Sequence, residues 1–407
     1  MDLNTLTLYK NYKKREDIHG TVLYPAVMVA PIQKDIIKEL MKEEKIESIF
    51  DPFHGSGTSL YEAMEINANL KLIGCDINPL ANLITKVKLQ GIDKSILKDI
   101  DFLKYLISER KYDESFTFFN IKKWFREDIA ISLKILRNSI MKIENIRNRM
   151  YFWCMLSDIV RKYSNTRSST YKLHIKENEK IKRIQNFVIE DYISNVEKNI
   201  EKYKKSSNNF RLYKCNILEK IRTFKTDCFD ITITSPPYGD NATTVTYGQF
   251  SSLTLNWIDK RDLEIEGWEY DNYSAIDSKS LGGKGKESFL GKLEKELLEP
   301  YLTKISNDKQ KKVIRFFSDY FKVISELCRV TKKRIILTLG NRTVDGIKID
   351  LTDITMKYLE NNGFKNIGKI EREIPNKRAP RIISKKDNKI VKSINCEYII
   401  IHEKVIL

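Results

Sequence analysis

Short apolar runs with the β-branched character of buried strands recur along the chain, and helical patterns lie between several of them. This alternation is typical of a parallel sheet with helices on both faces, because parallel neighbours need a crossover connection. Only a polar stretch separates the last two runs, so we expect them to form an antiparallel hairpin at the end of the sheet. The predicted strands lie in residues 47–53, 70–78, 210–217, 229–237, 334–341, 364–373 and 396–404, and the clearest helical patterns in 31–45, 58–68 and 311–333.

Two segments interrupt the alternation. Residues 91–209 are rich in amphipathic helical patterns and in basic side chains, so we interpret them as an inserted helical subdomain. Residues 259–312 are polar and contain the glycine-rich stretch LGGKGKE, which predicts a mobile insertion loop. The remaining residues, 1–90 and 210–407, are then expected to form one α/β domain around the sheet.

The fourth predicted strand ends in the sequence TSPPY, residues 234–238. Proline lacks a backbone N–H and restricts the residue before it, so the strand must stop there. Ser235, Pro236, Pro237 and Tyr238 are therefore presented at its carboxyl end, which is where open parallel sheets bind ligands. By itself, the stretch is more typical of a proline-terminated strand with an aromatic cap.

The first predicted strand runs into DPFHGSGTS, residues 51–59, and a helix is expected to begin near Thr58. Glycines allow a tight turn and a close backbone approach to a ligand, and the helix N-terminus offers free N–H groups. Asp76 ends the second strand, where an acid can accept both hydroxyls of a ribose. The alternative is an ordinary strand-to-helix turn with an N-capping aspartate.

The combination of DPFHGSGT, Asp76 and TSPPY resembles the S-adenosylmethionine-dependent amino-methyltransferases of DNA, particularly those acting on cytosine N4. Further similarity lies in LYPAVMVAP (23–31), LGNRTVDGIKIDLTD (339–353) and REIPNKRAP (372–380). The resemblance implies a Rossmann-like seven-stranded sheet and S-adenosylmethionine as cofactor. It assigns the methionine part to Tyr24, Pro25, Asp51, Phe53, Gly55, Gly57 and Thr58, the ribose to Asp76 and the adenine to Asn216. At the last position the family often has Asp, and a simple turn residue remains the alternative for Asn216.

The same resemblance gives the TSPPY stretch a catalytic role. An exocyclic amine conjugated to a pyrimidine ring is a poor nucleophile, because its lone pair is delocalised. Ser235 Oγ and the Pro236 carbonyl would accept its N–H groups and aim the lone pair at the sulfonium methyl group, while Pro237 keeps the platform rigid. Tyr238 would stack on a target base rotated out of the duplex.

Neighbouring chemistries can be weighed on the same residues. A cytosine-C5 enzyme needs a cysteine nucleophile after the proline, and residues 235–241 contain none. Adenine-N6 enzymes usually carry Asp or Asn where Ser235 stands, so Ser235 favours cytosine N4 over this runner-up. RNA amine methylation and a catalytically silent DNA-binding protein are more remote alternatives, and the second would be marked by a broken cofactor turn or a lost SPPY.

The formal net charge of +17 fits a polyanionic partner, although a lysine-rich proteome would give a similar excess. The family resemblance implies double-stranded DNA as substrate. Because the helical insertion lies between the cofactor motif and TSPPY, we expect it to contact the DNA, with 259–312 as a second candidate. On 161–176 the candidate DNA-binding residues are Arg161, Lys162, Arg167, Ser168, Ser169 and Thr170, with a solvated basic loop as the alternative. On the terminal hairpin they are Lys377, Arg378 and Arg381, where edge-strand solubilisation is almost as plausible.

The six cysteines form no Cys-x-x-Cys pair and do not combine with the four histidines at zinc-ligand spacing, so no metal site is expected. The N-terminus lacks the apolar stretch of a signal peptide, and no run approaches a membrane-spanning length, which predicts a cytoplasmic protein. The family resemblance also implies a cognate restriction endonuclease as partner.

Overall fold

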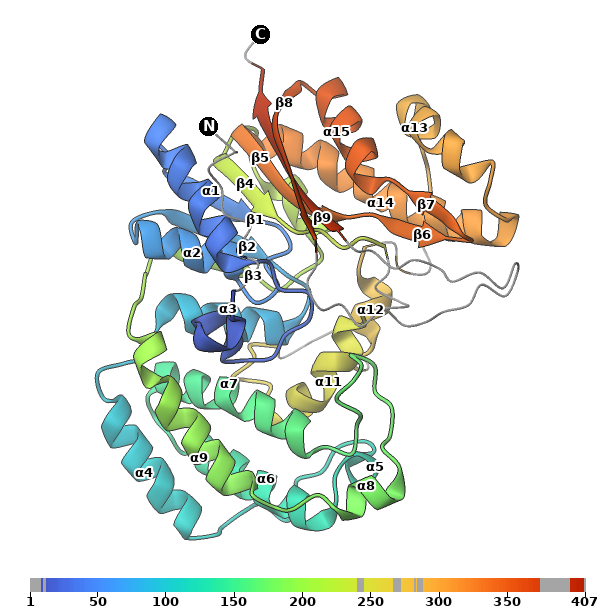
Figure 1. The fold of residues 1–407 in the computed structure, drawn as a ribbon. Coiled ribbons are helices and arrows are strands. Elements are labelled where there is room, and N and C mark those ends of the chain that lie inside the picture. The colour runs from blue at the N-terminus through green and yellow to red at the C-terminus, as the bar shows by residue number, and fades with distance from the viewer. Residues whose placement is uncertain are drawn as a thin grey trace.

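The computed structural model describes residues 9, 12–239, 245–265, 272–281, 283, 288–373 and 396–405. Its centre is a seven-stranded sheet in the order β3-β2-β1-β4-β5-β9-β8 (Figure 1). The pairs among β3, β2, β1, β4 and β5 are parallel, while β9 is antiparallel to both β5 and β8. The strands are β1 (Ser48–Asp51), β2 (Lys71–Cys75), β3 (Phe210–Tyr213), β4 (Phe229–Thr234), β5 (Thr331–Gly340), β8 (Phe364–Glu373) and β9 (Cys396–Lys404).

All seven predicted strands are present, and the terminal antiparallel pair is confirmed. The last strand of the chain, β9, lies inside the sheet between β5 and β8. The sequence analysis did not predict a second, short hairpin formed by β6 (Arg342–Val344) and β7 (Ile347–Ile349). Its turn contains Asp345 and Gly346, both at positive φ, which is the Asp-Gly signal of a tight hairpin.

Helices cover both faces of the sheet, because alternate strand residues point to opposite sides. Ile49 of β1 belongs to a core shared with α1, α2, α3 and the helices of the insertion. Its neighbour Phe50 belongs to a second core, shared with α14 and α15. These helices are α1 (Ala30–Glu43), α2 (Thr58–Ile66), α3 (Pro79–Gln90), α14 (Asn307–Val330) and α15 (Leu351–Asn361).

The segment between β2 and β3 is helical and lies below the sheet in the view of Figure 1. Its buried side chains, such as Trp153 of α7, share one continuous core with the adjoining sheet face, so the insertion is packed against the sheet domain. The helices are α4 (Ile96–Ser108), α5 (Ile121–Trp124), α6 (Glu127–Met141), α7 (Ile146–Tyr163), α8 (Asn178–Lys182) and α9 (Val188–Asn199).

The polar stretch 259–312 was predicted to be a loop. Its described residues include the helices α12 (Ala275–Lys279) and α13 (Lys292–Leu302) and the start of α14. Most of its LGGKGKE motif lies outside the described residues. Short helices α10 (Ile217–Lys220) and α11 (Tyr247–Trp257) follow β3 and β4 and border the site described next. No helix in the described part of the chain is both long and apolar enough to span a bilayer.

Candidate active site

The turn between β1 and α2 is anchored by Asp51, the last residue of β1. Its side chain is fully buried and accepts hydrogen bonds from Ser59 Oγ, from Thr234 Oγ1 (2.6 Å) and from the Phe53 amide (3.1 Å). Burial raises the pKa of the Asp51 carboxyl, against the effect of these donors. The carboxylate thus joins three segments, namely the end of β1, the end of β4 and the first turn of α2.

Gly57 gives this turn its shape. It precedes α2 with φ at +74°, in the left-handed region that L side chains rarely adopt. A Cβ atom there would lie 2.6 Å from the Cγ2 and Oγ1 atoms of Thr85 on α3. Glycine is therefore needed both for the backbone angle and for the close packing of α2 against α3.

Asp76 follows β2 and holds the neighbouring turn. Its Oδ2 accepts the Gly55 amide (3.0 Å) and its Oδ1 accepts the Asn78 amide (2.8 Å). Burial raises the pKa of this carboxyl as well. The Asn78 side chain donates to Tyr24 Oη (3.2 Å) and to Ser251 Oγ (2.8 Å) on α11, so the end of β2 is tied to the N-terminal segment and to α11.

Three hydroxyl and carbonyl groups form a directed chain at the end of β4. Tyr238 Oη donates its proton to the Thr338 carbonyl on β5 (3.3 Å). Ser235 Oγ lies 3.0 Å from Tyr238 Oη, a contact in which either oxygen can donate. We infer that Ser235 is the donor when Tyr238 directs its one proton to the Thr338 carbonyl, and in that arrangement the Ser235 oxygen keeps its lone pairs for a donor from a ligand.

These strand ends border one cavity with an empty volume of about 850 Å³, part of it open to solvent. Its wall contains most of the predicted cofactor residues and half of the predicted catalytic ones. Those that line it are Tyr24, Pro25, Phe53, Gly55, Thr58, Asp76, Asn216, Ser235 and Pro237. Asp51, Gly57, Pro236 and Tyr238 do not line it, and Asp51 and Gly57 instead shape the turn from behind. The cofactor and catalytic roles of all these residues stay predictions.

Asn216 is both a cavity residue and a helix cap. Its Oδ1 accepts the Leu218 amide (3.1 Å) and so caps α10. The turn role considered from sequence is therefore present, and the side-chain amide nitrogen remains the group that could reach a ligand. Next to it, Cys215 also lines the cavity, with its Sγ 3.5 Å from Cys75 Sγ.

The sequence analysis missed the wall of the cavity that α12 forms. Ile276, Lys279, Ser280 and Leu281 around α12 line the cavity, next to Tyr247 at the start of α11. Asp277 fixes α12 in place, because its carboxylate accepts the Gly248 (2.8 Å) and Gln249 (3.0 Å) amides at the start of α11. No local motif marks these residues, since they reach the cavity only through the packing of 259–312 against α11.

The predicted DNA-binding residues of 161–170 divide into two groups. Arg161 lies over the Phe250 ring (4.3 Å to its centroid) and donates to the Thr170 carbonyl (2.7 Å), and burial lowers its pKa to about 10. Lys162 is paired with Asp191. Arg167, Ser168 and Ser169 are exposed.

These exposed residues sit at the tip of a small hairpin, in which Thr166 pairs with Ile175 and the Arg167 amide donates to the His174 carbonyl (2.8 Å). The hairpin also contacts α11, because the Tyr171 ring meets Phe250 at 5.8 Å. Arg161 is therefore held by internal contacts, while Lys162 is paired but exposed. At the exposed tip, Arg167 Nε donates to the Ile175 carbonyl (3.2 Å), beside the helix that borders the cavity. Lys377, Arg378 and Arg381 lie outside the described residues.

Comparison with known proteins gives one match over nearly the full chain. The chain is 32% identical over 411 aligned residues to the type II methyltransferase M.MvaI of Kocuria varians. The aligned region covers 93% of this chain and 89% of that protein. A shorter match, 36% identical over 93 residues, joins 23% of this chain to 17% of the type II methyltransferase M.MjaII of Methanocaldococcus jannaschii. No family model and no solved structure matches. On the strength of the first match, together with a fold and a strand-end cavity that suit methyl transfer, the chain belongs to the type II methyltransferases.

Proposed function

We propose that the protein transfers a methyl group from S-adenosylmethionine to the exocyclic N4 amine of cytosine in double-stranded DNA, as the modification enzyme of a restriction-modification system. One observation carries the proposal. The glycine turn after β1, the acid after β2 and Ser235 after β4 come from distant parts of the sequence and line a single cavity. The family membership of the chain supports the same reaction class.

The cavity residues suit S-adenosylmethionine. Asp76 accepts only one backbone N–H on each carboxylate oxygen, so each oxygen has a lone pair left for a ribose hydroxyl. The N-terminus of α2, which begins at the cavity residue Thr58, offers N–H groups to the methionine carboxylate. The amide nitrogen of Asn216 can donate to an acceptor nitrogen of the adenine ring.

When bound, the cofactor supplies an electrophilic methyl group on a sulfonium. Ser235 Oγ, which gives its own proton to Tyr238, accepts an N–H of the target amine, and the Pro236 carbonyl accepts the other. With the cofactor bound, the nitrogen lone pair would form the new N–C bond as the C–S bond breaks, S-adenosylhomocysteine would leave, and the proton released by the amine would pass to solvent water. This in-line transfer needs no covalent intermediate with the protein.

Duplex DNA hides the target amine inside the stack, so the base must be rotated out to reach Ser235. Tyr238 is our candidate for stacking on that base. The exposed Arg167, Ser168 and Ser169 are suited to contact phosphate oxygens next to α11. The overall charge of +17 favours the same polyanion.

In the decisive experiment, the protein is incubated with plasmid DNA and labelled S-adenosylmethionine. The DNA is then digested to nucleosides, and the methylated nucleoside is identified by mass spectrometry. We expect N4-methylcytosine. N6-methyladenine would keep the cavity assignment but replace the target base. Absence of any labelled nucleoside, with cofactor binding demonstrated, would point to RNA or to a silent DNA-binding protein.

A matched variant assigns the chemistry to Ser235. Ser235→Ala should lower the methylation rate by about 100-fold, the effect of removing one group that stabilises a transition state, while DNA and cofactor affinities stay near those of the wild type. Methylation at a near-normal rate by this variant would refute the role given to Ser235.

A further inference from the structure

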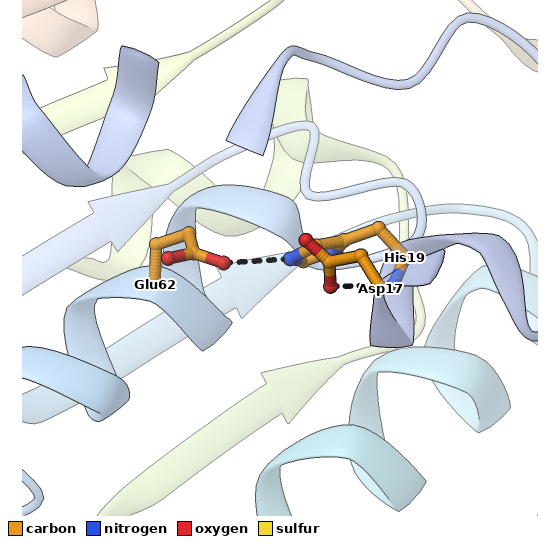
Figure 2. A group of neighbouring side chains, drawn as sticks. All are labelled: Asp17, His19 and Glu62. Atoms are coloured by element: carbon orange, nitrogen blue, oxygen red, sulfur yellow. Dashed lines mark hydrogen bonds and ion pairs between the residues drawn. The ribbon is translucent and has the colours of Figure 1, made fainter. Parts of the chain in front are cut away.

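Behind the cofactor turn lies a buried polar cluster that the proposed reaction does not use. His19 is 1% exposed, and its Nε2 hydrogen bonds to Glu62 Oε1 on α2 (2.8 Å), while its backbone amide donates to Asp17 (3.2 Å), as Figure 2 shows. Lys88 of α3, also 1% exposed, places its Nζ 3.3 Å from His19 Nδ1. The four residues come from three segments of the chain that converge beside α2.

Asp17, His19 and Glu62 could in principle hold a metal ion, since their ligand atoms lie within 4.8 Å of one another. Two ammonium groups already supply positive charge there. Lys88 contacts the His19 ring nitrogen, and Lys34 Nζ lies 3.4 Å from Glu62 Oε2. The hydrogen-bond directions are then fixed, because neutral His19 donates from Nε2 to Glu62 and accepts at Nδ1 from Lys88. We therefore interpret the cluster as an ammonium-centred network.

Lys88 connects this network to the cofactor turn. Its Nζ donates to the backbone carbonyl of Ser56 (2.7 Å), and Ser56 lines the cavity. The same peptide unit carries the Gly57 amide, which donates to the His54 carbonyl (2.7 Å). Because a peptide unit is planar, these two bonds together fix its orientation immediately before the first turn of α2.

We propose that Lys88 is a positioning residue for the cofactor, holding the Ser56–Gly57 peptide plane through its protonated side chain, with His19 and Glu62 aligning it from behind. This inference rests on the proposed cofactor site. It assigns the network to cofactor affinity rather than to stability, since a buried ammonium group whose direct partners are a neutral ring and a carbonyl does not favour folding.

The electrostatic surroundings of Lys88 make the network sensitive to pH. Burial is the main cause that lowers its pKa to about 7, with Lys14 adding to the shift, while Asp17 and Glu62 oppose it. Burial likewise raises the pKa of Glu62 to about 7, which Lys34 opposes. The neighbouring His19 and Cys154 both stay neutral, because burial moves the pKa of His19 well below and that of Cys154 above the usual value.

The lowered pKa of Lys88 affects folding stability and cofactor affinity in different ways. A lysine whose pKa is lowered in the folded protein reduces stability at pH values below its folded pKa, and this penalty disappears as the pH rises toward the unfolded value. For cofactor binding, the protonated form makes the stronger, charge-assisted hydrogen bond to the Ser56 carbonyl, so affinity should fall as the pH rises through about 7. Stability and affinity are thus expected to change in opposite directions.

The test measures binding of S-adenosylhomocysteine by calorimetry, together with the Tm of the unliganded protein. Lys88→Met should weaken binding by about tenfold, the effect of one charge-assisted hydrogen bond acting indirectly. Its Tm should change little, because relief of the buried charge offsets the loss of a donor to the Ser56 carbonyl and to His19 Nδ1. The control is Arg334→Met, which removes another buried cation, bound to Glu43 (2.8 Å) and Glu403 (3.0 Å), and should leave affinity unchanged.

The pH dependence of cofactor affinity distinguishes a positioning role of Lys88 from a purely structural one, because a structural role would leave this dependence unchanged. Between about pH 6 and about pH 8.5, wild-type affinity should decrease, whereas Lys88→Met should show a flat profile. Glu62→Gln keeps an acceptor for His19 but removes the negative charge, so the midpoint should shift to lower pH. This second variant tests the proposal even if Lys88→Met does not fold.

Two results would overturn the inference: equal affinity and pH slope in wild type and Lys88→Met, or an affinity loss accompanied by lower Tm and an unchanged slope in both variants. Failure of the proposed function looks different, because wild-type protein would then not bind S-adenosylhomocysteine at any pH.

Discussion

The ends of β1 and β2 carry the same residue type in adjacent parallel strands, yet their aspartates act differently. Asp51 lies behind the turn, outside the cavity wall, and accepts from Ser59, Thr234 and the Phe53 amide. Asp76 lines the cavity and accepts only two backbone amides. The difference arises from the neighbours, because β1 lies between β2 and β4 and the side chain of Asp51 reaches a hydroxyl on β4.

The comparison shows that position at a strand end does not by itself make an acid a ligand. An acid that accepts from side-chain hydroxyls behind the turn is engaged internally and organises the scaffold. An acid held only by backbone amides keeps lone pairs for a ligand. Substitutions at the two ends should therefore separate stability from cofactor affinity.

The largest effect is expected for Asp51→Ala. This change leaves Thr234 Oγ1, Ser59 Oγ and the Phe53 amide without their buried acceptor. We expect the free energy of unfolding to fall by about 3 kcal/mol or more, measured by urea denaturation. An unchanged unfolding midpoint would contradict the scaffold role of Asp51.

Asp76→Ala should act on affinity instead. Loss of two hydrogen bonds from ribose to a carboxylate should weaken S-adenosylhomocysteine binding by about 100-fold, with a smaller loss of stability than Asp51→Ala. Because burial raises the pKa of Asp76, wild-type affinity should also fall on acidification at a higher pH than for an ordinary aspartate. Calorimetry across pH checks both expectations, and Asp76→Ala with wild-type affinity would place the ribose elsewhere.

Thr234→Val isolates one donor to Asp51. The side chains are similar in shape, so the variant removes mainly the 2.6 Å hydrogen bond. Stability should decrease by about 1.5 kcal/mol in urea denaturation, while cofactor affinity stays unchanged. A change in affinity without a change in stability would mean that the end of β1 also contacts the ligand.

The end of β4 adds the proposed binding site of the methyl acceptor to this comparison. Tyr238→Phe keeps the ring but removes the hydroxyl that receives the Ser235 proton. Single-turnover methylation should slow by about three- to tenfold, the value of one neutral hydrogen bond, with DNA affinity retained. A loss of DNA affinity instead would favour a direct contact of the Tyr238 hydroxyl with the substrate.

Local sequence patterns predicted much of this arrangement. The β-branched runs predicted the seven strands. Glycine predicted the turn at Gly55 and Gly57, and polarity at a strand end predicted the acid at position 76. Each of these signals acts over only a few residues. Tyr24 was chosen through the family resemblance; it lines the cavity, and its cofactor role stays a prediction.

The remaining features depend on contacts between distant segments. Asp51 turns away from the cavity because it accepts a hydrogen bond from Thr234, a residue 183 positions later in the chain that no local pattern connects to it. The α12 wall and the buried Lys88 have no local signature, since α12 is placed by Asp277 on α11 and Lys88 by a carbonyl 32 residues earlier. Arg161, chosen for its charge, packs against Phe250, a contact that its charge did not predict, and its DNA-binding role stays a prediction.

A crystal structure with S-adenosylhomocysteine bound tests the central claim most directly, because it shows whether cofactor and acceptor sites share the strand-end cavity. We predict that the ribose hydroxyls lie on the Asp76 carboxylate and that the sulfur faces Ser235. A ligand bound outside this cavity, or with its ribose away from Asp76, would contradict the account.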